Sequence, residues 1–309
     1  MRIGSLCTGY GGLDMAAQRV FGGRLRWVSD VDPGPIALLA HHYPDVPNLG
    51  DLKTVDWATV ELVDLLTAGY PCQPFSNAGK RLGTEDPRHL WPWIARAIGA
   101  LRPRIVVLEN VAAHLRKGFD VVLADLAGLG YDVAWSIVRA SDTGAAHQRA
   151  RLFIVATDAA REPVEGSLAE AVPARGAFPP DGLASPVPDT ESVGRREGGP
   201  QPAQFERGPD AAHDREPLDW QEFEPAIRQW ERRLGRPAPA PSVFGPRGGV
   251  KVSPAFGEWL MGLPEGRITD VPGLSINEQL KLVGNGVVPQ QAEHAIRYLT
   301  AQLVVHDAA

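Results

Sequence analysis

The sequence predicts an α/β fold with a doubly wound, mostly parallel β-sheet and a smaller second domain. Over the first 157 residues, short apolar runs of strand type alternate with longer segments whose apolar residues recur at helical spacing. Alternation of this kind is typical of βαβ units, which place parallel strands side by side. After residue 160 a Pro/Gly-rich segment begins and the alternation stops, which predicts a separate second part of the chain.

The strands and helices of the first part follow one another in order. The first strand is expected at residues 2–6, and a turn with Gly9, Gly11 and Gly12 leads into a helix that runs to Phe21. Further strands are expected at 25–29, 63–68, 105–108, 131–138 and 151–157, and further helices at 35–42, 90–101 and 119–129. Parallel strands of such a sheet end at the same edge, so the residues that follow them are expected to form the functional site.

The second part of the chain is different in composition. Residues 161–220 hold 10 Pro and 7 Gly with almost no periodic apolar positions, which predicts a flexible insert. A helix is expected at 220–234, an apolar segment at 256–263 and a final helix at 289–304. We expect residues 1–157 and 273–309 to form one domain and residues 158–272 a small one, with Trp220, Trp230 and Trp259 in its core.

Composition narrows the class of protein. The chain of 309 residues is 44% hydrophobic and 22% charged, which is ordinary for a globular protein. No run of 18 apolar residues is present, and the N-terminus lacks the apolar region of a signal peptide, so neither a membrane span nor export is expected. The two cysteines, Cys7 and Cys72, have no metal-ligand spacing around them, which argues against a disulfide framework or a zinc site and fits a reducing cytoplasm.

Charge is distributed unevenly along the chain. The net charge of −6 argues mildly against a nucleic-acid partner, because phosphate binding usually leaves a basic footprint. Residues 161–226 carry 6 Lys/Arg against 14 Asp/Glu, whereas residues 227–251 carry 6 Lys/Arg against one Glu. A basic footprint is therefore present, and it is confined to one segment.

The sharpest chemical signal is Cys72 in the segment Gly-Tyr-Pro-Cys-Gln-Pro-Phe-Ser, which directly follows an apolar strand. A thiol at the carboxyl end of a parallel strand is a candidate nucleophile. The alternative is that a lone cysteine is a small buried hydrophobe, which is how we interpret Cys7.

Two further signals lie at the same edge of the predicted sheet. Glu109 follows the apolar strand 105–108, and an acid in that position is either a functional carboxylate or a helix cap. Arg149 and Arg151 precede the strand that begins near residue 151, and side chains at i and i+2 of an extended segment point to the same side. Alone, such a pair of arginines could equally be a solvated strand edge.

Together these residues resemble the cytosine-C5 DNA methyltransferase family over nearly the whole chain outside residues 160–220. Six motifs occur in the family's order and at plausible spacing. They are Ser-Leu-Cys-Thr-Gly-Tyr-Gly-Gly-Leu at 5–13, Pro-Cys-Gln at 71–73, Glu-Asn-Val at 109–111, His-Gln-Arg-Ala-Arg at 147–151, Leu-Met-Gly-Leu-Pro at 260–264 and Gly-Asn-Gly-Val-Val-Pro at 284–289.

The resemblance implies a fold of the S-adenosylmethionine-dependent methyltransferase type and a role for each catalytic residue. Cys72 would attack carbon 6 of a cytosine flipped out of the duplex, which makes carbon 5 nucleophilic. Glu109 would bind ring N3 and the exocyclic amine. Arg149 and Arg151 would hold the base and order the catalytic loop.

The resemblance also implies S-adenosyl-L-methionine as the cofactor. The glycine turn lets the backbone approach a ligand, and its G-x-G-G spacing differs from the G-x-G-x-x-G of dinucleotide enzymes. Asp30 would bind the ribose hydroxyls and Asp51–Leu52 the adenine. The full set of expected cofactor-binding residues is Leu6, Cys7, Gly9, Gly11, Gly12, Leu13, Asp30, Val31, Asp51, Leu52, Gly69, Pro71, Asn285, Gly286 and Val287.

The expected partner is double-stranded DNA, read by residues 158–272 as a target-recognition domain. The expected DNA contacts are Gln73, Ser76, Arg228, Arg232, Arg233 and Arg236. We further expect a monomer that acts in the cytoplasm without a metal, in restriction–modification with a partner endonuclease or in protection of phage DNA.

The chain departs from the family in places: Cys7 stands where Phe is usual, Val31 where an aromatic residue often stacks on adenine, and Ala146-His147 where Pro-Gln is usual. Three rival functions remain open. An RNA cytosine methyltransferase of the tRNA branch would carry a Cys-Phe-Thr signature, which does not occur here. A catalytically silent DNA-binding relative would not need Cys72, and a nicotinamide dehydrogenase would leave Cys72 and Glu109 without a role.

Overall fold

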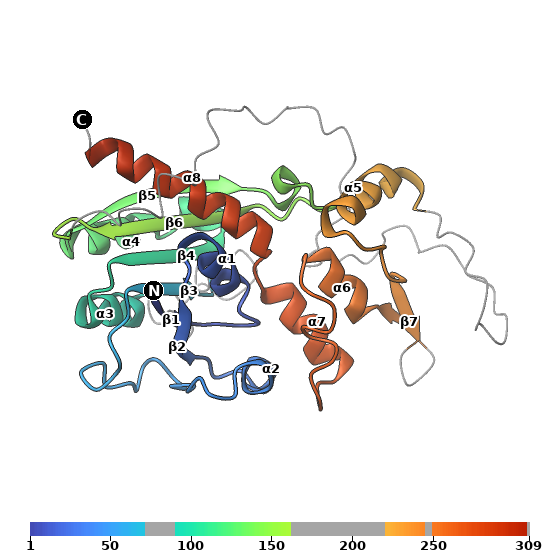
Figure 1. Cartoon of the computed structure of the whole chain (residues 1–309), viewed down its shortest axis with the longest axis horizontal. Helices are drawn as coiled ribbons and strands as arrows, with labels where there is room; N and C mark the ends of the chain where they lie inside the picture. Colours follow the sequence, from blue (N-terminus) through green and yellow to red (C-terminus); the bar gives the residue numbers. More distant parts are fainter. Residues whose placement is uncertain (72–89, 162–219, 245–248, 308–309) are drawn as a thin grey trace.

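The computed structural model describes residues 1–71, 90–161, 220–244 and 249–307, and it confirms the predicted α/β class. Six strands form one sheet (Figure 1). Their spatial order is β2 (Arg24–Ser29), β1 (Arg2–Leu6), β3 (Leu65–Gly69), β4 (Ile105–Val111), β6 (Arg151–Asp158) and β5 (Tyr131–Val138). The first four are parallel, and β6 is antiparallel to both of its neighbours.

Helices cover both faces of the sheet because its strands are apolar on both faces, as parallel strands usually are. Helices α1 (Gly12–Phe21) and α8 (Pro289–Asp307) share one buried cluster with Ile3, Leu65 and Phe153. Helices α3 (Trp91–Leu101) and α4 (Phe119–Gly128) share the other with residues such as Leu66 and Val106. Successive strand residues thus alternate between the two cores, which is the two-residue period of a strand.

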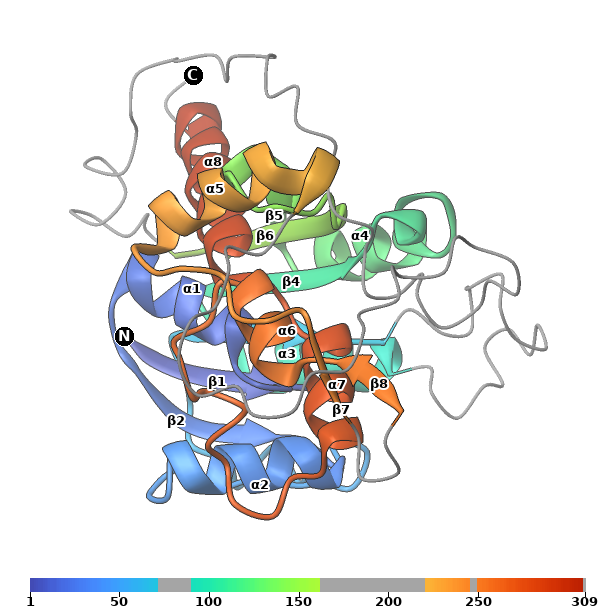
Figure 2. The ribbon, with the colours of Figure 1, turned by 90° about the vertical axis from the view of Figure 1, so that its right-hand side faces the viewer.

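The remaining elements gather beyond one end of the sheet (Figures 1 and 2). They include the 3-10 turn Gln221–Phe223, α5 (Glu224–Leu234), the hairpin of β7 (Ser242–Phe244) with β8 (Val250–Val252), α6 (Pro254–Leu260) and α7 (Ile276–Asn285). Helix α2 (Pro33–His42) contacts α7 from the β2 side.

Aromatic side chains hold α5 against α6. The Trp230 and Trp259 side chains are fully buried, and the Trp230 indole donates a hydrogen bond to the Trp259 carbonyl at 3.1 Å. The Phe256 ring stacks with both Trp220 and Trp259, with ring centroids 5.6 Å apart in each pair. The core position predicted for Trp230 and Trp259 is confirmed, and this cluster is continuous with the α1 and α8 side of the main core.

Three elements differ from the sequence-based expectation. Strand β4 runs on through Glu109 and Asn110 to Val111, because these residues pair with Phe153, Leu152 and Arg151 of antiparallel β6. Helix α7 was not expected, although Ser275 and Glu278 form a capping box at its start. The β7–β8 hairpin falls where only a Pro-rich turn was expected. Among the described helices, none combines the length and the apolar character that a membrane crossing would require.

Candidate active site

Four chain segments converge at the carboxyl edge of the sheet. Gly69, the last residue of β3, pairs with Glu109 of β4. A Cβ atom on Gly69 would lie 3.6 Å from Oε2 of Glu109 and 3.9 Å from both the Cys7 carbonyl oxygen and the Val287 side chain. The end of β3, the Glu-Asn-Val motif, the glycine-turn motif and the C-terminal motif therefore meet at one point, although they lie far apart in the sequence.

Glu109 and Arg151 form a buried ion pair at this edge. The Arg151 Nε lies 3.1 Å from Oε1 of Glu109, and their side chains are 7% and 9% exposed. Both residues sit on neighbouring strands, because β4 and β6 pair antiparallel in this region. The pair holds a carboxylate in a fixed orientation, with its second oxygen over Gly69.

The end of β3 is anchored just before the predicted nucleophile. The Asn110 amide donates to the Tyr70 carbonyl at 3.2 Å, and the Tyr70 hydroxyl lies 3.0 Å from Nε2 of buried His114. Pro71 follows as an exposed residue. Cys72, Gln73 and Ser76 lie outside the described residues.

Arg149 is bound to the C-terminal motif, whereas Arg151 pairs with Glu109. Nη2 of Arg149 donates to the carbonyls of Gly284 at 2.7 Å and Gly286 at 2.6 Å, and the Arg149 backbone has a φ of 37°. A positive φ is uncommon for a residue with a side chain and is found where the surroundings force it. In the structure Arg149 therefore ties the start of β6 to the end of α7.

The glycine turn and the C-terminal motif interlock. Gly9 and Gly11 have φ values of 58° and 81°, a region that favours glycine. A Cβ on Gly12 would lie 2.6 Å from the Tyr10 ring and overlap the Val287 carbonyl oxygen, and the Tyr10 hydroxyl donates to that oxygen at 2.7 Å. Close backbone approach at Gly12 and Gly286 thus fixes both walls of a cavity.

This cavity is lined by residues of two of the predicted motifs, the glycine turn and the C-terminal motif, together with residues of β3 and α1. The lining comprises Ser5, Leu6, Cys7, Thr8, Gly9, Tyr10, Gly12, Leu13, Asp14, Thr67, Gly69, Asn285, Gly286 and Val287. Most of the expected cofactor-binding residues are in this set. Asp14 and Thr67 were not predicted from the sequence.

The second strand contributes an acid beside the same turn. Asp30 accepts hydrogen bonds from the Gly9 amide at 2.9 Å and the Asp32 amide at 3.0 Å, and burial raises the pKa of its carboxyl. Val31 is 63% exposed, so its side chain is free to meet a ligand. Asp51 is exposed, whereas the Leu52 side chain is buried in the core.

Cys7 is a poor nucleophile in this position. Burial is the main cause that raises the pKa of its thiol to about 12, and the nearby carboxylates of Asp30 and Asp51 contribute to the same rise. A thiol with such a pKa is protonated at neutral pH, and the thiolate is the reactive form. This agrees with our interpretation of Cys7 as a small buried hydrophobe, which here lies in the wall of the cavity.

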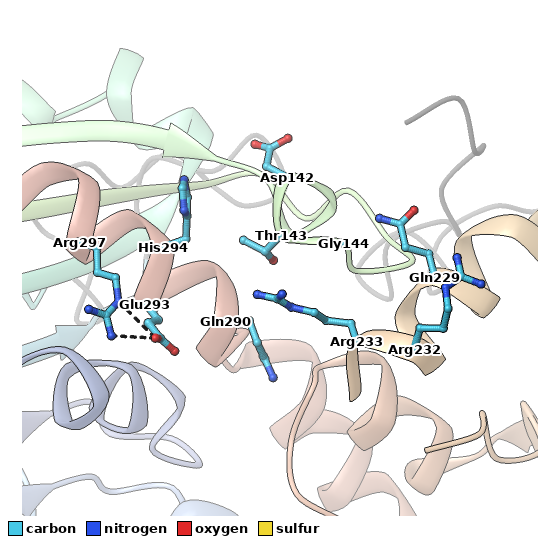
Figure 3. Close-up of a pocket in the computed structure, with 10 residues that line it drawn as sticks. All are labelled: Asp142, Thr143, Gly144, Gln229, Arg232, Arg233, Gln290, Glu293, His294 and Arg297. Carbon is cyan, nitrogen blue, oxygen red and sulfur yellow. Dashed lines mark hydrogen bonds and ion pairs between the residues drawn. The ribbon is translucent and has the colours of Figure 1, made fainter. Parts of the chain in front are cut away.

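The four predicted DNA-contacting arginines divide into two kinds. Arg228 pairs with Glu224 and Glu231, both at 2.7 Å, and Arg236 donates to the Leu263 carbonyl. Arg232 and Arg233 instead line a pocket of about 670 Å³. Figure 3 shows Arg233 extending from α5 into this pocket, whose other wall is α8 and the 3-10 turn Ala140–Thr143.

The described residues form no cluster of metal ligands. Within the described ranges, no three His, Cys, Asp or Glu side chains gather as ligands for an ion.

Comparison with known proteins shows the family. The model of the C-5 cytosine-specific DNA methylase family matches residues 1–183, which is more than half of the chain. The chain belongs to the C-5 cytosine-specific DNA methylase family. The match takes in the glycine turn, the Pro-Cys-Gln motif, Glu109 and Arg151.

Several curated relatives are similar over part of their length. The Type II methyltransferase M.NlaIV of Neisseria lactamica is 36% identical over 140 residues, covering 41% of this chain and 33% of the relative. The Type II methyltransferase M.MspI of Moraxella sp is 32% identical over 157 residues, covering 49% and 37%. The matched part of this chain thus spans about a third of the length of each of these relatives.

Solved structures share the fold over almost the whole chain. The S. pombe Dnmt2 methyltransferase superposes with a TM-score of 0.63 at 15% identity, covering 98% of this chain and 99% of the other. A Spodoptera frugiperda DNMT2 mutant superposes with a TM-score of 0.60 at 14% identity, covering 96% and 99%. At this level of identity the likeness is one of fold.

Proposed function

We propose that the chain is an S-adenosylmethionine-dependent DNA (cytosine-5) methyltransferase. The observation that carries the proposal is the buried Glu109–Arg151 pair, 3.1 Å apart, at the edge where β3 leads into Pro71 and Cys72. The carboxylate of Glu109 is fixed beside Gly69, which precedes Pro71 and Cys72 in the sequence, and it lies next to a glycine-lined cavity. A carboxylate in this position suits activation of a base next to a bound methyl donor.

The chemistry needs a nucleophile and a group that stabilises charge on the base. The Cys72 thiolate would form a bond to carbon 6 of cytosine, and the electron pair of the C5–C6 double bond would become available at carbon 5. Glu109 would hold a proton at ring N3 and accept from the exocyclic amine. After carbon 5 takes the methyl group and loses its proton, elimination of Cys72 restores the ring. The base must leave the duplex for this, because carbon 6 is not accessible within the stack.

Arg151 would act through Glu109. Its guanidinium donates to one carboxylate oxygen and leaves the other directed toward Gly69. Desolvated charges are costly unless paired, so the pair keeps Glu109 in place before the base arrives. Arg149 would fix the cofactor side, since it binds the carbonyls on both sides of Asn285.

The residues that line the cavity beside this pair suit the binding of S-adenosylmethionine. Gly12 and Gly286 leave no space for a side chain and bring backbone groups to the cavity surface, as ligand-cradling turns do. Asp30 would bind the ribose hydroxyls, the Asp51–Leu52 segment would contact the adenine, and Asn285 would close the pocket. When bound, the cofactor would supply an electrophilic methyl group on a sulfonium.

DNA would be read by residues 158–272. Arg232 and Arg233 form no ion pair with any described residue, so they are the arginines of this segment that suit phosphate contacts. Arg228 and Arg236, which bind within the protein, are the weaker candidates. The names of the Type II relatives support a role in restriction–modification beside an endonuclease, and we propose that the chain acts there as a cytoplasmic monomer.

Covalent trapping tests this function. DNA in which every cytosine is replaced by 5-fluorocytosine should form a denaturation-resistant adduct with the protein in the presence of S-adenosylmethionine, because fluorine cannot leave as a proton does. The Cys72→Ser variant should form none, and cytosine-containing DNA should form none with either protein. Absence of an adduct with the wild type, or an adduct with Cys72→Ser, would rule out the proposed covalent role.

A further inference from the structure

A buried acid outside all the predicted site residues lines the cofactor cavity. Asp14 lies in the first turn of α1, and the residue is 1% exposed. Its carboxylate accepts a hydrogen bond from the Ser5 hydroxyl at 3.0 Å and another from the Thr67 hydroxyl. All three residues line the cavity formed by the glycine turn and the segment Asn285–Gly286–Val287.

The carboxylate is oriented but not neutralised. Among the described residues, no Lys, Arg or His forms an ion pair with Asp14. Arg267 is the cation that acts on the Asp14 charge. Both groups lie beside Gly11, since a Cβ on Gly11 would be 3.2 Å from Nη2 of Arg267 and 3.7 Å from Oδ2 of Asp14. That Nη2 already donates to the Tyr10 carbonyl at 2.8 Å and to the Tyr43 hydroxyl at 3.1 Å.

The groups around Asp14 leave it short of positive charge. Burial raises the pKa of Asp14 to about 6, although the two hydroxyl donors and Arg267 act to lower it. The other titratable side chains of the cavity wall are the Tyr10 phenol and the Cys7 thiol, and burial holds the pKa of each above its usual value, so both are neutral near pH 7. Asp30, which accepts a hydrogen bond from the Gly9 amide, is a further acid beside the glycine turn.

A carboxylate can accept about four hydrogen bonds, and two of these positions on Asp14 are taken by hydroxyls. The remaining acceptor capacity and the charge that Arg267 compensates only in part suit a cation that enters the cavity. An acid in the first turn of a helix also interacts favourably with the helix dipole, so a purely structural role is the alternative.

We propose that Asp14 binds the positive charge of the methyl donor, so that cofactor binding is coupled to ionisation of this residue. The inference rests on the proposed function, because S-adenosylmethionine carries two cations, an ammonium and a sulfonium. S-adenosylhomocysteine, the product, keeps the ammonium and lacks the sulfonium. If Asp14 faces the sulfonium, it also favours the donor over the product.

The coupling has a definite sign. A bound cation favours the ionised carboxylate, so binding near pH 6 should release part of a proton from Asp14. Below that pH the affinity should fall by about tenfold per pH unit, because the proton and the cation compete for the same group. At pH 8, where Asp14 is ionised before binding, no proton should be released from it.

Isothermal titration calorimetry on the full chain measures this release directly. S-adenosylmethionine and S-adenosylhomocysteine are titrated at pH 6 and pH 8 in two buffers of different ionisation enthalpy, with the wild type and Asp14→Asn. We expect proton release by the wild type at pH 6 that Asp14→Asn lacks. Equal effects of the variant on the two ligands would assign the ammonium as the contact, whereas a larger effect on S-adenosylmethionine would assign the sulfonium.

A second variant covers a failure of Asp14→Asn to fold. Thr67→Val removes one donor to the carboxylate, so the pH at which proton release is greatest should move upward. Identical proton release in the wild type and Asp14→Asn, or an unmoved midpoint in Thr67→Val, would overturn the inference and leave Asp14 as a structural residue. Failure of the wild type to bind either ligand would instead overturn the proposed function.

Discussion

Replacement of Gly286 by Ala tests the interlock between the glycine turn and the C-terminal motif. The backbone of Gly286 has φ −81° and ψ 179°, which any residue can adopt, so the effect should be steric. Its Cβ would lie 2.5 Å from Cδ1 of Tyr10 and closer still to Cε1 and Cζ. Since carbon atoms pack at about 3.5–4 Å, the ring would have to move by about 1 Å or more.

The Tyr10 ring has no room to move, because it is fully buried and its hydroxyl donates to the Val287 carbonyl at 2.7 Å. Overpacking of a core costs about 1–3 kcal/mol, and loss of the hydrogen bond about 1 kcal/mol more. We therefore expect Gly286→Ala to lower the free energy of unfolding by about 2–4 kcal/mol and to weaken cofactor binding.

Urea denaturation and calorimetric titration with S-adenosylmethionine measure the two effects. Gly284→Ala is the matched control, since a Cβ there would meet nothing within 4 Å and alanine favours the helix by about 1 kcal/mol. The cost of Gly286→Ala should shrink in a Tyr10→Ala background, because the clash is then gone. Equal stability of the two glycine variants, or no rescue by Tyr10→Ala, would refute the steric argument.

Three further predictions follow from buried or unpaired charges. Arg151→Ala should abolish methylation and cost about 3–5 kcal/mol in urea denaturation, because Glu109 is left buried without its partner, and a stable variant would contradict this. Burial lowers the pKa of His147 to about 3, so protonation of this residue in the unfolded state favours unfolding as the pH falls below about 6.5. When the pH is lowered from about 7.5 to about 5, the free energy of unfolding should therefore fall less in His147→Gln than in the wild type. Replacing Arg232 and Arg233 with Ala should reduce the slope of log affinity for DNA against log salt by about 2, and an unchanged slope would place the DNA elsewhere.

The central sheet could be predicted from the sequence because its elements are long and regular. The strands at 2–6 and 131–138 match the structure residue for residue. The end of β4 could not be predicted from the sequence, because Glu109 and Asn110 are polar and are held extended by pairing with β6. Helix α7 is amphipathic but short and lies between loops, so its capping box was its strongest signal.

Motif order predicted which segments would meet at the site, but not what each side chain does there. Asp14 looks like an ordinary first-turn acid in the sequence, and only the fold brings Thr67 to its carboxylate. Arg267 reaches the Tyr10 carbonyl across 257 residues, a contact with no local signal. The direction of Arg149, toward Gly284 and Gly286, depends on a positive φ that the sequence does not reveal.

The most direct test of the central claim is mass spectrometry of nucleosides from DNA treated with the purified protein and S-adenosylmethionine. We predict that 5-methyldeoxycytidine accumulates with the wild type and is absent with Cys72→Ser, while N4-methyldeoxycytidine and N6-methyldeoxyadenosine stay at background. Sequencing of the bisulfite-treated product would then give the target site. Methylation of an exocyclic nitrogen, or 5-methyldeoxycytidine formed without Cys72, would contradict the proposed function.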